Sequence, residues 1–214
     1  MIDGLNIPDQ PGKLLDSGAV AKVPTIMGTN RDEGTLFFGI GATAADDAEY
    51  LAFMEYLFPG HGAAIVAKYP SAAAGSAKDA ATAALADGEF VCPTRRTARA
   101  MAKAGAPTYL YQFVRVASTG LFKPFGVFHS AELPFVFGNA YLGIVLDEDE
   151  QKLSAAMQHY WFGLASTGDP NYKGAFAWPA YDAAGDKNIV LDVTLSSASG
   201  LQSGLCDFWD GLKP

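Results

Sequence analysis

Three short apolar segments, separated by long helical stretches, constrain the fold of this chain more than any other feature. They span residues 23–29, 108–115 and 187–193. The first shows no alternation of polar and apolar residues, which is typical of a strand buried on both faces in a parallel sheet. The second is aromatic and β-branched and also favours a strand. Strands separated by helices predict an α/β fold of about three strands with surrounding helices.

The stretches between these segments carry helical signals. We expect helices at residues 44–58, 63–69, 76–105 and 148–166, and a short helical turn at 207–212. The alanine-rich stretch 76–105 is expected to break near Gly88 or Pro93. Residues 1–21 contain glycine and proline at short intervals and are expected to form loops.

The charge balance excludes several classes of partner. Fifteen Lys and Arg against 23 Asp and Glu give a formal net charge of −8 over 214 residues. Such a surface repels phosphate groups, so neither nucleic acid nor an anionic membrane is an expected partner. No apolar run approaches the ~20 residues needed to span a bilayer, and residues 1–20 lack a signal-peptide pattern. We expect no cofactor.

Only three histidines are present, and they are far apart in the sequence, so no metal site is expected. His61 lies in a Pro-Gly-His-Gly turn and is expected to be solvated. His159 lies mid-helix, where a packed or capped core position is expected. His129 follows a loop and precedes Glu132 by three residues, an arrangement in which a carboxylate could orient a general base. Spacing alone does not decide that role.

Glu33 is the second candidate, because it follows the end of the first predicted strand by four residues. Functional groups collect at the carboxyl ends of strands in open α/β sheets. The alternative is a solvated turn in which Arg31 and Asp32 pair. The local pattern alone favours that alternative.

Four blocks of sequence change this balance. They are residues 2–37, which include VPTIMGTNRDEGTLF, residues 128–138 with FHSAELPFVFG, residues 157–181 with TGDPN and WPAY, and residues 206–209 with CDFW. In this order they resemble the C-terminal part of the type-B carboxylesterase/cholinesterase family. The resemblance covers essentially the whole chain.

The resemblance implies an α/β-hydrolase fold in which Glu33 is the triad acid and His129 is the general base. The family order of nucleophile, acid and histidine is respected, since Glu33 precedes His129. Glu132 matches a further family carboxylate near the histidine, and either a supporting role at the site or a purely structural one is open. The resemblance leaves His159 in a structural helix.

Cys92 and Cys206, the only two cysteines, match positions that form a disulfide in cholinesterases. Such a bridge would close a loop of ~115 residues. It would imply an oxidising compartment, so the protein is expected to be secreted or periplasmic. Two reduced core thiols are the alternative.

The nucleophile is missing from these residues. No serine lies in a Gly-x-Ser-x-Gly motif, Ser203 being the nearest in GLQSG, and no Gly-Gly run offers an oxyanion hole. We therefore expect residues 1–214 to form a single partial domain without the nucleophile-bearing N-terminal part. A sheet divided at that point exposes a strand edge and an apolar face. It would bind a complementary N-terminal chain, form a homo-oligomer, or repack.

The substrate class is only weakly encoded. Leu36 stands where cholinesterases place an aromatic residue of the alcohol subsite, with Phe37 next, and Ala131 replaces an aromatic residue after the histidine. A cation–π site for choline is therefore not expected, and an apolar carboxylic ester fits better.

Three functions remain open from sequence. The first is a serine esterase segment, inactive without an N-terminal part that supplies the serine and the oxyanion hole. The second is a non-catalytic, cholinesterase-like interaction module. The third is a truncated gene product.

Overall fold

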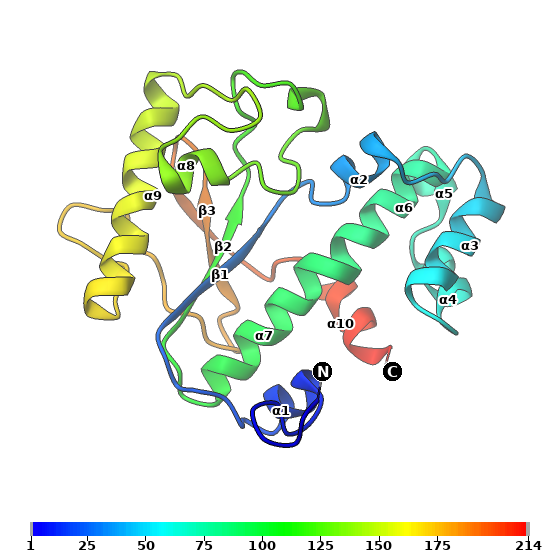
Figure 1. Cartoon of the computed structure of the whole chain (residues 1–214), viewed down its shortest axis with the longest axis horizontal. Coiled ribbons are helices and arrows are strands. Elements are labelled where there is room, and N and C mark those ends of the chain that lie inside the picture. The colour runs from blue at the N-terminus through cyan, green and yellow to red at the C-terminus, as the bar shows by residue number, and fades with distance from the viewer. Residues whose placement is uncertain (1, 213–214) are drawn as a thin grey trace.

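A four-stranded mixed sheet forms the centre of the structure, a computed structural model that describes residues 2–212 (Figure 1). Its strands, in spatial order, are β1 (Thr25–Asn30), β2 (Thr108–Phe113), β3 (Lys187–Leu191) and β4 (Ser196–Ser199). The first three run parallel, and β4 pairs antiparallel with β3. The predicted α/β class and three of the strands are confirmed. The fourth was missed because its Ser-Ser-Ala-Ser sequence is exposed and has no apolar pattern.

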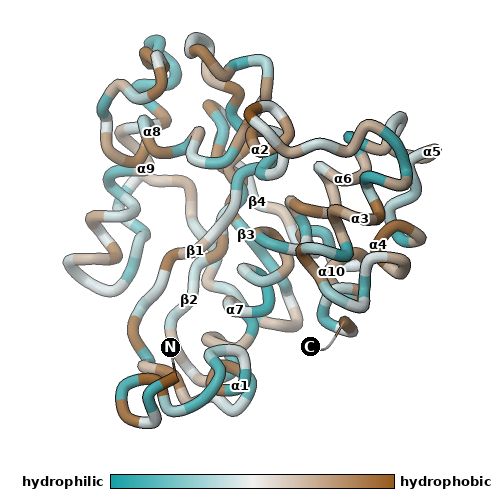
Figure 2. Tube along the Cα trace, turned by 45° about the vertical axis from the view of Figure 1, so that its right-hand side comes forward, coloured by the Kyte–Doolittle hydropathy of each residue, from teal (hydrophilic) through white to brown (hydrophobic). Residues whose placement is uncertain are grey.

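Helices surround this sheet. In chain order they are α1 (Pro11–Asp16), α2 (Thr35–Ile40), α3 (Asp47–Leu57), α4 (Gly62–Lys68), α5 (Ser71–Ala74), α6 (Ala77–Leu85), the π-helix η1 (Ala86–Val91), α7 (Cys92–Lys103), the 3₁₀ turn η2 (Lys123–Phe125), α8 (Leu133–Phe137), α9 (Glu148–Thr167) and α10 (Ser203–Gly211). No helix within residues 2–212 is both long and apolar enough to cross a membrane. Apolar and polar segments alternate along the trace instead (Figure 2).

The two long helices α7 and α9 lie on opposite faces of the sheet (Figure 1). Alternate side chains of β2 show this, because Tyr109 and Phe113 pack in the cluster that holds Met157 of α9. Leu110 points the other way and packs against Ala98 of α7. A central parallel strand is therefore buried on both faces, as its unbroken apolar sequence predicts.

Two helical expectations need correction. Residues 11–16 form α1 where a loop was expected, and Pro11 occupies its first turn, where the missing N–H costs nothing. The predicted break near Gly88 or Pro93 is also wrong, since the chain continues from α6 through η1 into α7. Pro93 lies in the first turn of α7, directly after the π-helix η1. Gly88 is required for packing, because a Cβ there would lie 2.6 Å from the Trp209 ring.

A disulfide joins Cys92, at the start of α7, to Cys206 in α10, across a separation of 114 residues. Both cysteines are buried in an apolar cluster with Tyr50 and Met54 of α3. The bridge implied by the family resemblance is present, and the alternative of two reduced thiols is wrong. The disulfide holds α10 beside the start of α7, where α7 follows the π-helix η1.

Asp87 of η1 carries a buried carboxyl group, five residues before Cys92. The Tyr69 hydroxyl donates to its Oδ2 at 2.8 Å, and Trp209 Nε1 donates to the Tyr69 oxygen at 2.7 Å. Burial raises the pKa of Asp87 from 3.8 to about 6, against the lowering effect of the Tyr69 hydrogen bond. The folded protein therefore holds this proton more tightly than the unfolded chain does.

This linkage predicts a specific pH dependence of stability. The stability that protonated Asp87 contributes is fully present below about pH 4 and is lost as the pH rises through about 6. The full difference is about 3 kcal/mol, of which about 2 kcal/mol falls between pH 4.5 and pH 7. The variant Asp87→Asn keeps an acceptor for Tyr69 and should lack this loss. Urea unfolding at pH 4.5 and 7, chosen near those two pKa values, measures it. Glu89→Gln, exposed on the same helix, should behave like the wild type, and an equal slope in Asp87→Asn would contradict the assignment.

Candidate active site

Glu33 lies in the turn that joins β1 to α2, at the carboxyl end of the strand. Its side chain is buried, with a residue exposure of 5%. The solvated-turn alternative is half right, because Arg31 and Asp32 do pair at 2.9 Å. Glu33 itself points inward.

The Glu33 carboxylate contacts the imidazole of His129. Its Oε2 lies 2.7 Å from His129 Nδ1, and its Oε1 accepts a hydrogen bond from the Asn30 backbone N–H at 2.7 Å. Burial raises the pKa of Glu33, while the hydrogen bonds from Asn30 and His129 act in the opposite direction. Both carboxylate oxygens are thus engaged, which fixes the side chain.

The other edge of the His129 ring is accessible. The side chain is 42% exposed, and no hydrogen bond within the described residues engages Nε2. The ring packs against Phe90 and Phe37, with centroid separations of 4.9 and 5.6 Å. A carboxylate at Nδ1 and a free Nε2 are the arrangement that a general base needs.

Backbone contacts hold the His129 segment against the Glu33 turn. Asp32 and Val127 exchange hydrogen bonds, since Asp32 N donates to Val127 O at 3.0 Å and Val127 N donates to Asp32 Oδ2 at 2.8 Å. Thr35 Oγ1 donates to Phe125 O at 2.7 Å. Gly126 makes this close approach possible, because its φ is +69° and a Cβ there would lie 2.4 Å from Asp32 Oδ2.

Glu132 approaches the site through Asn30 and makes no hydrogen bond with His129. The Asn30 side-chain amide donates to Glu132 Oε2 and, at 2.9 Å, to the Phe128 carbonyl oxygen. Glu132 also contributes to the raised pKa of Glu33, as the smallest of its causes. Its contact therefore stabilises the Asn30 residue whose backbone N–H binds Glu33.

Of the two weakly predicted pocket residues, only Phe37 faces the histidine. Leu36 packs instead into the cluster of β2 and α9. An apolar groove of about 430 Å³ runs beside the site, lined mainly by Phe37, Ile40, Phe53, Leu57, Leu85 and Phe90. Phe90 was not singled out from the sequence. The signal that could have found it is its position in η1, two residues before the disulfide-bonded Cys92.

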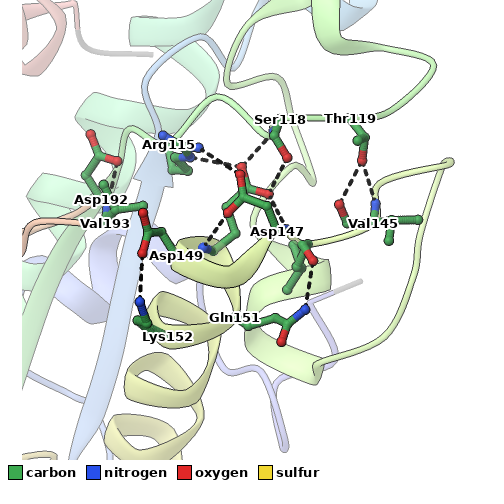
Figure 3. A network of polar contacts seen from close by, with 12 residues as sticks. Arg115, Ser118, Thr119, Val145, Asp147, Asp149, Gln151, Lys152, Asp192 and Val193 are labelled. Atoms are coloured by element: carbon green, nitrogen blue, oxygen red, sulfur yellow. Dashed lines mark hydrogen bonds and ion pairs between the residues drawn. The ribbon is translucent and has the colours of Figure 1, made fainter.

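The loop that leads from β2 toward His129 is fastened by Glu150, a completely buried residue in the first turn of α9. Arg115, Ser118 and Asp147 lie around this turn (Figure 3). Its carboxylate accepts hydrogen bonds from Arg115 Nε at 2.9 Å, Ser118 N at 2.6 Å, Ser118 Oγ at 2.8 Å and Asp147 N at 3.1 Å. Asp147 in turn caps the helix by accepting from Glu150 N. Asp147 and Glu150 thus form a capping box at the start of α9, and the ion pair with Arg115 ties it to the loop.

Glu150→Gln should destabilise the protein by about 3 kcal/mol, because it leaves Arg115 without its charged, buried partner and places an amide N–H donor where the surrounding donors need an acceptor. Urea unfolding measures the change. Glu148→Gln is the matched control, two residues away on the same helix, with a side chain that is 89% exposed. Equal effects in the two variants would contradict the role given to burial.

The remaining histidines lie outside this arrangement. His61 precedes α4 and is half-buried. The expectation of a core position for His159 is wrong, because its side chain is exposed and bonds through Nδ1 to Ala155 O at 2.6 Å. The helical period puts Tyr160, not His159, on the buried face. Across residues 2–212, no group of three or more His, Cys, Asp and Glu side chains could hold a metal ion.

Comparison with known proteins now decides the family. The carboxylesterase family profile matches residues 1–209. The chain belongs to the carboxylesterase family. It is 33% identical to carboxylesterase 5A of Felis catus over 98% of this chain and 42% of that protein. It is 28% identical to the acetylcholinesterase of Bungarus fasciatus, over 100% of this chain and 39% of that protein.

A bacterial protein is also among the relatives. The para-nitrobenzyl esterase of Bacillus subtilis strain 168 is 30% identical over 89% of this chain and 38% of its own length. This carboxylesterase-family chain therefore spans about two-fifths of the length of these relatives. The fold agrees with part of an α/β-hydrolase, as the resemblance implied.

Proposed function

We propose that this chain carries the acid and the base of a serine ester hydrolase, with Glu33 as the acid and His129 as the general base. One observation carries the proposal: a buried carboxylate lies 2.7 Å from Nδ1 of a histidine whose side chain is 42% exposed. In this role Nε2 accepts the proton of a serine hydroxyl. The carboxylate fixes the tautomer and stabilises the imidazolium that forms.

The serine and the oxyanion hole come, in this proposal, from a complementary N-terminal segment. Residues 1–214 then act as one partial domain. Support comes from β1, which pairs only with β2 among the described strands and forms the edge of the sheet. At its carboxyl end, Thr29 Oγ1 and Asn30 Oδ1 are buried without a hydrogen-bond partner in the described residues. A further strand, parallel to β1 and paired with it, would place the residues at its own carboxyl end beside Thr29 and Asn30, where they would supply hydrogen-bond partners.

Apolar side chains are exposed in the segments before and after β1. Val23, just before β1, and Ile40, at the end of α2, are 55% and 65% exposed. Covering them favours association with an apolar partner surface. A homo-oligomer would cover them as well, but it would not supply a Gly-x-Ser-x-Gly serine, because this sequence has none.

The proposed substrate is an apolar carboxylic ester. The groove beside Phe37 and Phe90 is apolar apart from the Glu89 side chain at its margin. The net charge of −8 argues against nucleic acid as a partner. The buried disulfide is compatible with an oxidising compartment, so we place the protein outside the cytoplasm, secreted or periplasmic.

A non-catalytic interaction module is the second candidate, and the free β1 edge is the observation that favours it. That candidate does not require the buried Glu33 carboxylate to contact His129. Burying a carboxyl group costs stability, and here a histidine pairs with it in the arrangement that a catalytic base needs. This pair therefore favours the esterase role.

Complementation tests the proposal. The chain alone should not hydrolyse a short-chain aryl ester. Adding a carboxylesterase N-terminal segment that contains the Gly-x-Ser-x-Gly motif should restore turnover and fluorophosphonate labelling of its serine. His129→Ala should lower the restored kcat roughly 10³-fold or more.

His159→Ala is the matched control, since that histidine is exposed on α9, and it should leave turnover unchanged. A complex that forms but hydrolyses nothing would support the interaction module. Turnover that survives His129→Ala would contradict the assigned base.

A further inference from the structure

Two hollows meet on the face of α7 that is turned away from the sheet. One has a volume of about 450 Å³ and the other of about 520 Å³. Both are lined by Leu15, Arg96 and Asp210, so the two hollows adjoin; together they are called the trough between α1, α7 and α10. Neither is lined by Glu33, His129 or Phe90.

The first half of the trough is mainly apolar, although Arg96, Asp210 and His61 also line it. Its walls include Leu57, Phe58, Pro59 and Trp209. The Phe58 and Trp209 rings pack with centroids 4.8 Å apart. Because Trp209 Nε1 already donates to Tyr69, the indole offers only carbon atoms to the hollow. This half suits a hydrocarbon group.

The second half is basic. Lys22 joins three residues of α7, Arg96, Arg99 and Lys103, which share one helical face at spacings of three and four. Arg96 pairs with Asp16 at 2.6 Å and Arg99 with Asp210 at 3.1 Å. Lys22 and Lys103 pair with no carboxylate in the described residues. Four cations and two carboxylates leave two excess positive charges here, in a chain whose net charge is −8.

We propose that this trough binds an amphipathic anion, namely a carboxylate with a single acyl chain. The hydrocarbon chain lies in the apolar half against Phe58 and Trp209, and the carboxylate lies in the basic half with Lys22 and Lys103. The local excess of cations offsets the repulsion that the rest of an acidic surface imposes on an anion. The apolar walls supply the larger share of the binding free energy.

Calorimetric titration of the full chain with decanoate, below its micellar concentration, tests the proposal. We expect saturable binding of one decanoate per chain. Lys103→Glu should weaken binding about tenfold, and Lys103→Arg should retain it. Lys78→Glu, the same charge change at an exposed position on α6 that lines neither hollow, should change the affinity by less than about twofold.

Two further ligands separate the contributions of the halves. Decanol, without the charge, and inorganic sulfate, without the chain, should each bind at least about tenfold more weakly than decanoate. An affinity for decanol or for sulfate equal to that for decanoate would overturn the proposal. Equal losses of decanoate affinity in Lys103→Glu and Lys78→Glu would also overturn it, and so would the absence of saturable binding. Thermal melting confirms that each variant is folded. No ester turnover is measured, so this result stands apart from that of the esterase proposal.

Discussion

The contact between the Glu33 carboxylate and the His129 imidazole depends on two long-range features of the fold, the pairing of β1 with β2 and the contact between the segments that follow these strands. It joins residues 96 positions apart in the chain. Parallel pairing of β1 with β2 brings the carboxyl ends of both strands to one edge of the sheet. The segments that follow these strands then meet through the exchange of hydrogen bonds between Asp32 and Val127.

Burying Glu33 has a cost that the surrounding groups offset. Removal from water raises its pKa, while the hydrogen bonds from Asn30 N–H and His129 to its two oxygens favour the charged form. Asn30 is itself held by Glu132 and the Phe128 carbonyl. The carboxylate is thereby oriented before any substrate arrives, and such prior orientation reduces reorganisation during proton transfer.

The sequence predicted the sheet because its three parallel strands are apolar and bounded by glycine, proline or asparagine. It could not predict β4, whose residues are small, polar and exposed. It also predicted a helix break near Gly88 or Pro93, where the chain instead continues as the π-helix η1. Glu33 and His129 were singled out through family resemblance, since spacing alone favoured a solvated turn for Glu33.

Phe90 and Glu150 were overlooked because their partners, His129 and Arg115, lie 39 and 35 positions away in the sequence. His159 shows the opposite failure. A histidine among aromatic residues suggested a core position, but the helical period decided the face, and α9 turns that residue toward solvent. Contacts between distant segments were thus the part of the site that local patterns could not supply.

The tautomer of neutral His129 tests the central claim most directly. Nitrogen-15 NMR of the imidazole ring distinguishes a proton on Nδ1 from one on Nε2. If the Glu33 carboxylate orients the ring, neutral His129 carries its proton on Nδ1 in the wild type, and Glu33→Ala shifts the ring to a mixture of both tautomers. A proton on Nε2 in the wild type, or the same spectrum in both proteins, would contradict the account.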